Sequence, residues 1–286
     1  MSARTAAGRP ARKSGKPKAQ PSPRARTASP RSFVSDITIE HGPAEMLGRF
    51  FLKADTAARR RDVFLSFISP EEMLEINKRN ADTWRPILPL FNPQSSILTE
   101  DNCYCMAGRN AKGEVIATQA GRLLPWTGTN FHEEASSMRL FYTDPAGMKA
   151  EGEAVIVTAP AAKTLTGSVV FSGAIWYRPD YRGRQLPSII PYISRAYAYT
   201  RWKQECTMSI MAQDVHQRGM AERSGYSNVD WEVLLRRTPV IPDGDLHCAM
   251  VWMDSDFLLE GTADFLAGFD AQVDTGVGER RDQQYG

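Results

Sequence analysis

The feature that most constrains the fold of this chain is an apolar run that leads through an arginine-rich turn into a helix. The run 169-VVFSGAIWY-177 has the length and the β-branched and aromatic content of a buried strand. Residues 178–187 carry three arginines, two prolines and one glycine, a composition typical of a turn. Residues 188–202 have apolar side chains at helical spacing. A strand and a helix joined in this way predict a second, parallel strand beside the first.

The other segments predict strands and helices in both halves of the chain. Ser69 and Pro70 before two glutamates form a helix start. We expect helices at 70–84, 131–142, 215–225 and 257–269, a hairpin at 103–126, and strands at 206–212, 229–237 and 247–253. Residues 127–165, with an apolar run at 154–157, are interpreted as an insertion. The sequence therefore predicts an α+β fold, with a mixed, mostly antiparallel sheet and helices on both faces.

Charge is distributed unevenly along the chain. Residues 1–32 contain nine lysines and arginines and no acid, which leaves 26 basic against 33 acidic residues and a net charge of −7 for the remainder. This segment is rich in Pro, Ser, Ala and Gly and has few large apolar residues, so it is predicted to be a disordered basic tail. A basic arm of this kind can bind nucleic acid or an acidic surface.

The sequence has neither the apolar N-terminal core of a secretory signal nor an apolar run long enough to span a membrane. Cys103 and Cys105 are separated by one residue, and the other two cysteines stand alone, so no zinc motif is present. We expect a cytoplasmic protein with reduced thiols and no bound metal.

The turn has a familiar pattern. A strand followed by Pro179, Tyr181, Arg182 and Gly183 and then by a helix resembles the acetyl-CoA-binding turn of the GNAT superfamily of N-acetyltransferases, V-x-P-x-Y-R-G-x-G-x-G/A. After the next strand, 220-MAERSGY-226 resembles that family's L-Y-E-K-L-G-F helix end.

The resemblance covers residues 68–253 and implies the acyl-CoA N-acyltransferase fold, in which a central pair of strands splays apart. It implies a GNAT-like domain at 36–256. That domain follows the disordered basic tail, taken to residue 35, and precedes a short helix and polar tail at 257–286.

The resemblance also implies acetyl-CoA or another acyl-CoA as cosubstrate and an amine as acceptor. A helix start and a tight turn present N–H groups to phosphate, and arginines add charge-assisted hydrogen bonds. The cofactor-binding residues that it implies are Ile175, Trp176, Tyr177, Arg182, Gly183, Arg184, Gln185, Leu186, Pro187, Ser188 and Asp214.

Several positions differ from the family pattern. Gln185 and Pro187 stand where the family has glycine, and Pro187 has no N–H to donate. Ala221 stands where the family often has a tyrosine general acid, Asp214 replaces a frequent asparagine, and no carboxylate lies between residues 163 and 180. The candidates left for catalytic acid or base are Ser172, Tyr177, His216 and Tyr226.

Three functions agree with this sequence. The first is an acyl-CoA-dependent N-acyltransferase. The second is a related enzyme that takes its acyl group from an acyl carrier protein, which would dock on Arg178, Arg182 and Arg184. The third is a non-catalytic module whose residues 1–32 bind nucleic acid. For the amine acceptor we expect contacts within the insertion at 127–165 and with the aromatic residues Trp126, Phe131, Phe141 and Tyr142.

Overall fold

The strands of the chain join in one eight-stranded sheet, in the order β1-β2-β3-β5-β6-β8-β7-β4. The computed structural model describes residues 32–242 and 244–274. Within these residues, only β5 and β6 are parallel, and all other neighbouring strands are antiparallel. The strands are β1 Phe64–Ile68, β2 Cys103–Arg109, β3 Val115–Trp126, β4 Ala154–Val157, β5 Gly167–Tyr177, β6 Cys206–Ala212, β7 Asn228–Arg236 and β8 Asp245–Asp254.

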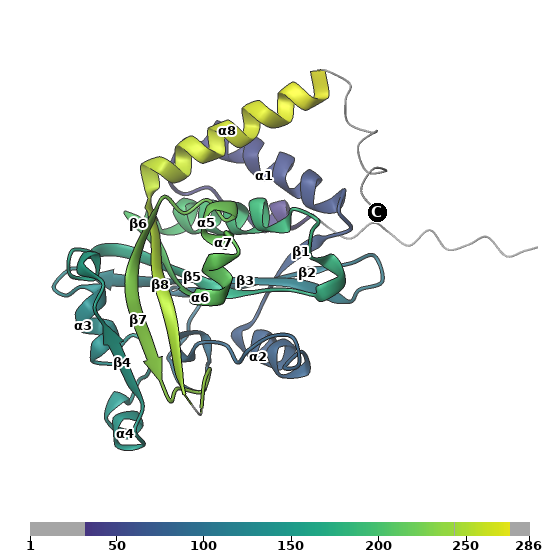
Figure 1. Cartoon of the computed structure of the whole chain (residues 1–286). Coiled ribbons are helices and arrows are strands. Elements are labelled where there is room, and N and C mark those ends of the chain that lie inside the picture. The colour runs from purple at the N-terminus through teal and green to yellow at the C-terminus, as the bar shows by residue number, and fades with distance from the viewer. Residues whose placement is uncertain (1–31, 243, 275–286) are drawn as a thin grey trace, which may run out of the picture. The chain divides into compact units, whose positions relative to one another are not determined.

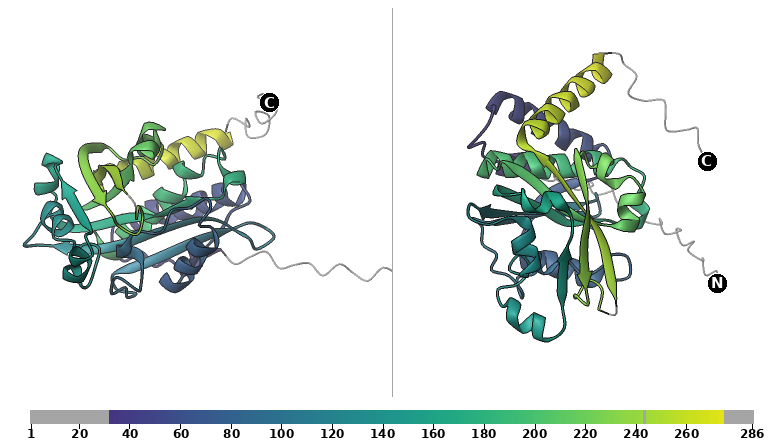
Figure 2. Two further views of the ribbon diagram at one scale, coloured as in Figure 1. Left: turned by 60° about the horizontal axis from the view of Figure 1, so that its bottom comes forward. Right: turned by 60° about the vertical axis from the view of Figure 1, so that its left-hand side comes forward.

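Helices cover both faces of the sheet (Figure 1). α1, α5 and α8 lie on one face, here called the α5 face, and α2 lies on the other, the α2 face. α8 packs against α1 and α5, and Figure 2 shows it beside α1. The helices are α1 Ala44–Arg59, α2 Pro70–Arg79, α3 Phe131–Ser136, α4 Pro145–Ala150, α5 Ile190–Trp202, α6 Gln213–Gln217, α7 Met220–Arg223 and α8 Ser255–Asp274.

Local sequence explains where the main helices begin and end. The Ser69 side chain accepts a hydrogen bond from the Glu72 N–H, and Pro70 occupies the first helical position of α2. α5 ends at Lys203, which adopts a left-handed conformation with φ of 49°. The 3-10 turn Leu186–Ser188 leads into α5, so this helix begins two residues later than expected.

The sheet separates two hydrophobic cores. Successive residues of β5 point to opposite faces, so Val170 packs with α1 and α5 whereas Phe171 packs with residues of α2. Phe50 and Ile193 are fully buried on the α5 face, and Phe131 is fully buried on the α2 face. This two-sided burial holds β5 at the centre of the molecule.

The predicted fold class is confirmed: a mixed, mostly antiparallel sheet with helices on both faces and a splayed central pair, described below. Some element predictions were wrong in detail. α3 stops at Ser136, before Met138 with its positive φ, and not at residue 142. Gly219, with φ of 71°, separates α6 from α7 in the segment expected to form one helix. α1 and β1 lie outside the predicted elements.

Residues 127–165, predicted to be an insertion, contribute β4 to the edge of the sheet, where it pairs with β7. α8 extends beyond the predicted range of 257–269 at both ends. Among the described residues, every helix is too short or too polar to cross a membrane. The predicted basic tail lies outside the described residues up to Arg31.

Candidate functional site

β5 and β6 separate within the sheet. Their pairing covers Val169 to Phe171 of β5 and ends at the pair Phe171–Met208, although β5 continues to Tyr177 and β6 to Ala212. The edge of β5 that faces β6 therefore has no strand partner from Ser172 onward. The unpaired part spans about 17–20 Å at roughly 3.3 Å per residue. This is the splayed strand pair that the resemblance predicts, and we call the opening the β5–β6 gap.

A β-bulge lies in the unpaired part of β5. Ala174 has a φ of 51°, and the register between β3 and β5 shifts at this point. As a result Gly173 and Ala174 both face the α2 side, where they pack with Phe91 and its neighbours. Beyond the bulge, Trp176 faces the α2 side and Tyr177 the α5 side. The bulge therefore leaves two small residues side by side on one face of the gap.

The arginine-rich turn follows β5 at the wide end of the β5–β6 gap and leads into α5. Gly183 and Gln185 both have positive φ, 83° and 57°. Within the described residues, the backbone N–H groups of Gly183, Arg184 and Gln185 have no hydrogen-bond acceptor. Consecutive free N–H groups before a helix N-terminus form a concave donor site that suits an anion.

The turn accommodates the two residues that depart from the family pattern. The Gln185 side chain accepts a hydrogen bond from Arg61 Nη2 at 3.0 Å, and Arg61 Nε donates to the Arg184 carbonyl at 2.9 Å. Gln185 thus takes the left-handed conformation that favours glycine, and its side chain is held by Arg61, which follows α1. Pro187 lies in the 3-10 turn, where its missing N–H costs no helical hydrogen bond.

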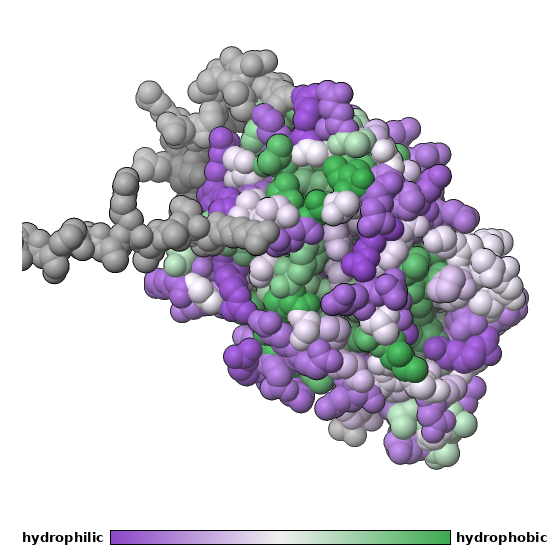
Figure 3. Space-filling view, turned by 180° about the vertical axis from the view of Figure 1, so that it is seen from behind, coloured by the Kyte–Doolittle hydropathy of each residue, from purple (hydrophilic) through white to green (hydrophobic). Residues whose placement is uncertain are grey.

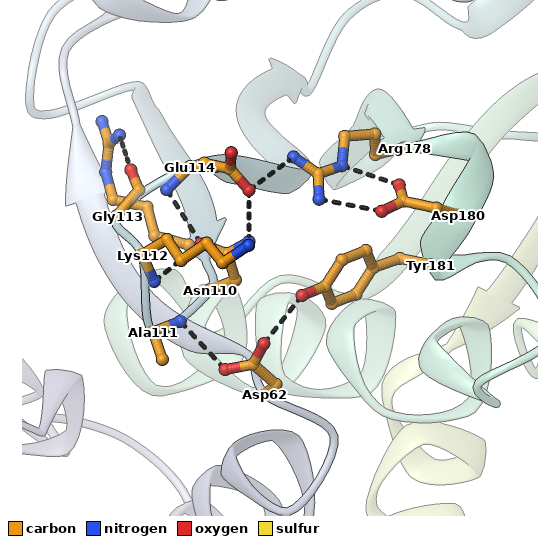
Figure 4. A network of polar contacts seen from close by, with 10 residues as sticks. Asp62, Asn110, Ala111, Lys112, Gly113, Glu114, Arg178, Asp180 and Tyr181 are labelled. Carbon is orange, nitrogen blue, oxygen red and sulfur yellow. Dashed lines mark hydrogen bonds and ion pairs between the residues drawn. The ribbon is translucent and has the colours of Figure 1, made fainter.

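A network of polar contacts fixes this turn to the β2–β3 loop (Figure 4). Arg178 binds Asp180 at 2.7 Å and Glu114 at 3.1 Å. Tyr181 Oη donates to Asp62 at 2.8 Å, and the Ala111 N–H donates to the other oxygen of Asp62 at 2.9 Å. The turn is therefore held from outside before any ligand is present.

The electrostatics of the network follow from these contacts. Hydrogen bonds from Arg178 lower the pKa of Asp180, and hydrogen bonds from Asn110 and Arg178 lower the pKa of Glu114. Asp180 and Glu114 raise the pKa of Arg178 in return. Because Arg178 is neutralised by two acids, the basic surface expected from Arg178, Arg182 and Arg184 is reduced to the latter two. Both are exposed, and Arg184 lies over the Tyr181 ring at 4.0 Å.

Two residues that the sequence analysis did not single out for function span the gap on the α2 face. The Trp84 ring stacks on Trp176 of β5, with centroids 5.6 Å apart and an interplanar angle of 16°. The neighbouring Arg85 pairs with Asp214 of α6 at 3.6 Å. Asp214 also binds Arg218. Its carboxylate, on the β6 side of the gap, is therefore paired with two arginines. Trp84 had no sequence signal beyond its position near a helix end.

The four catalytic candidates do not form one constellation. Ser172 is buried and accepts a hydrogen bond from Gln119 Nε2 at 2.8 Å. Tyr177 is buried on the α5 face, where burial raises its pKa and its hydroxyl has no hydrogen-bond partner among the described residues. His216 packs edge-on against Trp231 of β7, with centroids 5.2 Å apart, and not against β5.

Tyr226, the fourth candidate, is buried, and in the part of the chain that the structure describes its hydroxyl has no hydrogen-bond partner either. Its ring lies 4.8 Å from the guanidinium of Arg195, a fully buried residue of α5. Arg195 donates to the carbonyls of Pro191 and Ser224, and the Tyr192 ring lies on it at 5.0 Å. Tyr226 therefore helps to enclose a buried cation, which is a packing role.

The aromatic residues expected to contact the acceptor are part of the core. Trp126, Phe131, Phe141 and Tyr142 are all buried on the α2 face. Beside them, a cavity of about 450 Å³ is lined by residues 93–98, by Glu71 and by insertion residues that include Tyr142 and Asp144. Tyr142 donates to Glu153, and burial together with this bond raises the pKa of Tyr142. Acceptor contact in this region remains a prediction.

No protein-family model and no curated protein match the chain. Solved structures with similarity include the spermidine/spermine N-acetyltransferase SpeG from Vibrio cholerae, at 7% identity and a TM-score of 0.42, over 70% of this chain and 97% of that one. The aminoglycoside acetyltransferase AAC(6')-Ib, bound to coenzyme A and kanamycin, has 10% identity and a TM-score of 0.40, over 68% and 96%. Arabidopsis thaliana NAA60, bound to acetyl-CoA, has 11% identity and a TM-score of 0.41, over 68% and 99%.

These scores do not by themselves establish the fold. The observed topology is a mixed, mostly antiparallel sheet with a splayed β5–β6 pair, as the resemblance predicts.

Proposed function

We propose that the protein is an acyl-CoA-dependent N-acyltransferase that moves an acyl group to an amine. The observation that carries the proposal is the β5–β6 gap together with the turn at its wide end. The unpaired edge of β5 offers backbone groups to an extended ligand, as a neighbouring strand would. The free N–H groups of residues 183–185 lie where that ligand would place a diphosphate.

The proposed chemistry needs little from side chains. An amine that attacks a thioester requires close approach and stabilisation of the developing oxyanion, which backbone N–H groups can supply. The edge of β5 beyond Phe171 has no strand partner to compete for its backbone groups, and the β-bulge at Ala174 lies within this part of the strand. No general acid or base is assigned, because Ser172 is engaged by Gln119 and His216 packs on β7.

Coenzyme A binding to the wild-type protein, measured by isothermal titration calorimetry, tests the proposal. The double variant Arg182→Gln/Arg184→Gln should bind coenzyme A at least about tenfold more weakly, because each arginine adds a charge-assisted bond to phosphate. Arg236→Gln is the matched control, since Arg236 is also an exposed arginine but pairs with Asp245 on the β7–β8 hairpin. It should bind as the wild type does.

A wild-type protein that binds neither coenzyme A nor acetyl-CoA would contradict the proposal. Equal affinities for the wild type and the double variant would show that the turn is not the phosphate site. The acyl carrier protein and nucleic-acid alternatives have no supporting contact within the described residues.

A further inference from the structure

Arg195 of α5 carries a buried positive charge without a counterion. Its side chain is fully buried. Nε donates to the Pro191 carbonyl at 3.1 Å and Nη2 donates to the Ser224 carbonyl, whereas Nη1 has no acceptor among the described residues. Within the same part of the chain Arg195 forms no ion pair. A buried cation that binds only neutral groups is costly, because it has lost its hydration and gained no opposite charge.

Contacts between α5 and the sheet place Arg195 close to the point where the β5–β6 gap opens. Tyr104 of β2 lies across Gly121 of β3, where an added Cβ atom would be 2.5 Å from the Tyr104 hydroxyl. Gly121 pairs with Ser172, the first residue of β5 beyond the β5–β6 pairs. The Tyr104 hydroxyl donates to the carbonyl of Ser194 at 2.6 Å. Because Arg195 follows Ser194, α5 carries it over the row of the sheet in which the gap opens.

Two buried tyrosine hydroxyls accompany Arg195 on the α5 face, one from each side of the gap. The Tyr226 ring lies 4.8 Å from the guanidinium and packs with Met211 of β6. Tyr177 is the last residue of β5, and the charge of Arg195 lowers its pKa, which burial raises. Among the described residues neither hydroxyl has a hydrogen-bond partner. One N–H group and two O–H groups beside the gap are therefore unused.

The cluster of Arg195, Tyr177 and Tyr226 is closed on the side of α8. The Tyr192 ring lies 5.0 Å from the guanidinium of Arg195. Tyr192 also lies against Gly225 and Gly261, since an added Cβ atom would come closer than 3.0 Å to it at Gly225 and to 3.1 Å at Gly261. Tyr192 thus separates the cluster from α8, and the unpaired edge of β5 is its other boundary.

Hydrogen bonds within the cluster cannot satisfy all three donor groups. A chain of bonds from Nη1 through both hydroxyls would leave one O–H group without an acceptor and the positive charge uncompensated. A single anionic atom, in contrast, can accept hydrogen bonds from all three groups and neutralise the guanidinium.

We propose that Arg195, Tyr177 and Tyr226 form a binding site for a small monovalent anion, either a halide or one oxygen of a carboxylate. Nε and Nη2 of Arg195 already bind carbonyl groups, so the guanidinium does not offer the pair of parallel N–H groups that binds phosphate in a bidentate manner. The inference goes beyond the proposed acyl transfer and does not depend on it.

The test measures the melting temperature of the whole chain in increasing concentrations of sodium bromide, sodium acetate or sodium phosphate. Bromide or acetate should raise the wild-type melting temperature saturably, by about 5 °C when the anion is at about a hundred times its dissociation constant. Arg195→Met should lose this rise and keep only the general effect of salt. The variant is expected to fold, because an apolar side chain of similar length replaces an uncompensated charge.

Tyr226→Phe keeps the ring and removes one donor, so it should weaken anion binding at least about tenfold. Tyr142→Phe is the matched control, because Tyr142 is also a buried tyrosine but lies on the α2 face, where its hydroxyl donates to Glu153. It should keep the wild-type anion affinity. In crystals grown with sodium bromide, the anomalous signal should place a bromide ion next to Arg195 Nη1.

The proposal is overturned if neither bromide nor acetate gives a saturable rise, if phosphate alone does so, or if the wild type and Arg195→Met respond alike. Wild-type anion affinity in Tyr226→Phe would overturn it as well, and this measurement holds even where Arg195→Met does not fold. Coenzyme A binding, measured separately, tests only the proposed function, so the failure of either proposal leaves the other in place.

Discussion

At the scale of single residues, the turn tolerates both departures from the family pattern: the Gln185 side chain has a partner in Arg61, and Pro187 lies in a 3-10 turn where no helical N–H is lost. Gln185 has a φ of 57°, a conformation that costs about 1 kcal/mol or more for a residue with a Cβ. Its side-chain oxygen accepts a hydrogen bond from Arg61. It therefore does not bind the backbone N–H groups of residues 183–185, which have no acceptor among the described residues. Sequence comparison shows that glycine is missing, but only the structure shows where the glutamine side chain goes.

Replacement of Gln185 by glycine is expected to leave coenzyme A affinity within about threefold of wild type, because the lost side chain does not contact the donor site. It should also relieve backbone strain. Lys203→Gly is the matched control, since Lys203 also has a positive φ, 49°, but lies at the other end of α5. Calorimetry gives the affinities and urea unfolding the stabilities. A large gain in affinity for Gln185→Gly alone would mean that the side chain obstructs the ligand.

At the scale of elements, the site depends on how a turn, a hairpin loop and the end of α1 hold one another. Arg178 joins the turn to the β2–β3 loop through Glu114, and Tyr181 joins it to Asp62. The 3-10 turn Pro179–Tyr181 needs these contacts, because so short a helix has little stability of its own.

The pH dependence of this network is predictable. Because Arg178 lowers the pKa of Asp180 in the folded state, the stabilisation is present above the ordinary carboxyl range and is lost as the pH falls through the lowered pKa. Asp180→Asn should therefore be less stable than the wild type at pH 7, and the difference should shrink below about pH 4. Urea unfolding at several pH values measures the difference in the free energy of unfolding between the two proteins. A difference that is constant with pH would mean that the ion pair does not stabilise the turn.

At the scale of the whole molecule, the described residues bury apolar surface on both faces of one sheet. Apolar side chains also reach the surface, and on the face seen in Figure 3 they form separate groups between polar ones. Leu52, Ile97 and Phe257 are among the exposed ones, on α1, a loop and α8. The contacts described above for the turn and for the α2 face of the gap join residues between 61 and 218.

Removal of residues 1–31 should therefore leave the melting temperature and the coenzyme A affinity unchanged. Ser32, which donates to Asp55 at 2.7 Å, is retained in this variant. Any binding of nucleic acid by the full chain should disappear, because the remainder has a net charge of −7. Calorimetry and a DNA-binding titration at several salt concentrations provide the measurements. A loss of coenzyme A affinity would show that the removed segment takes part in the site.

The sequence by itself determined the central unit of this protein. An apolar run, a turn with glycine and proline, and a helical pattern specify strand, turn and helix through local preferences, which need no knowledge of the remaining chain. This was enough to predict the sheet's mixed character, whereas the splayed pair and the anion-binding role of the turn were expected from the resemblance to the GNAT superfamily. The tertiary structure alone decided the rest: that Arg178 is neutralised by Glu114 from a distant loop, that Trp84 and Arg85 span the gap, and that Phe91 lies on Gly173. These contacts join residues far apart in the chain, and packing between elements, which no local pattern encodes, brings them together.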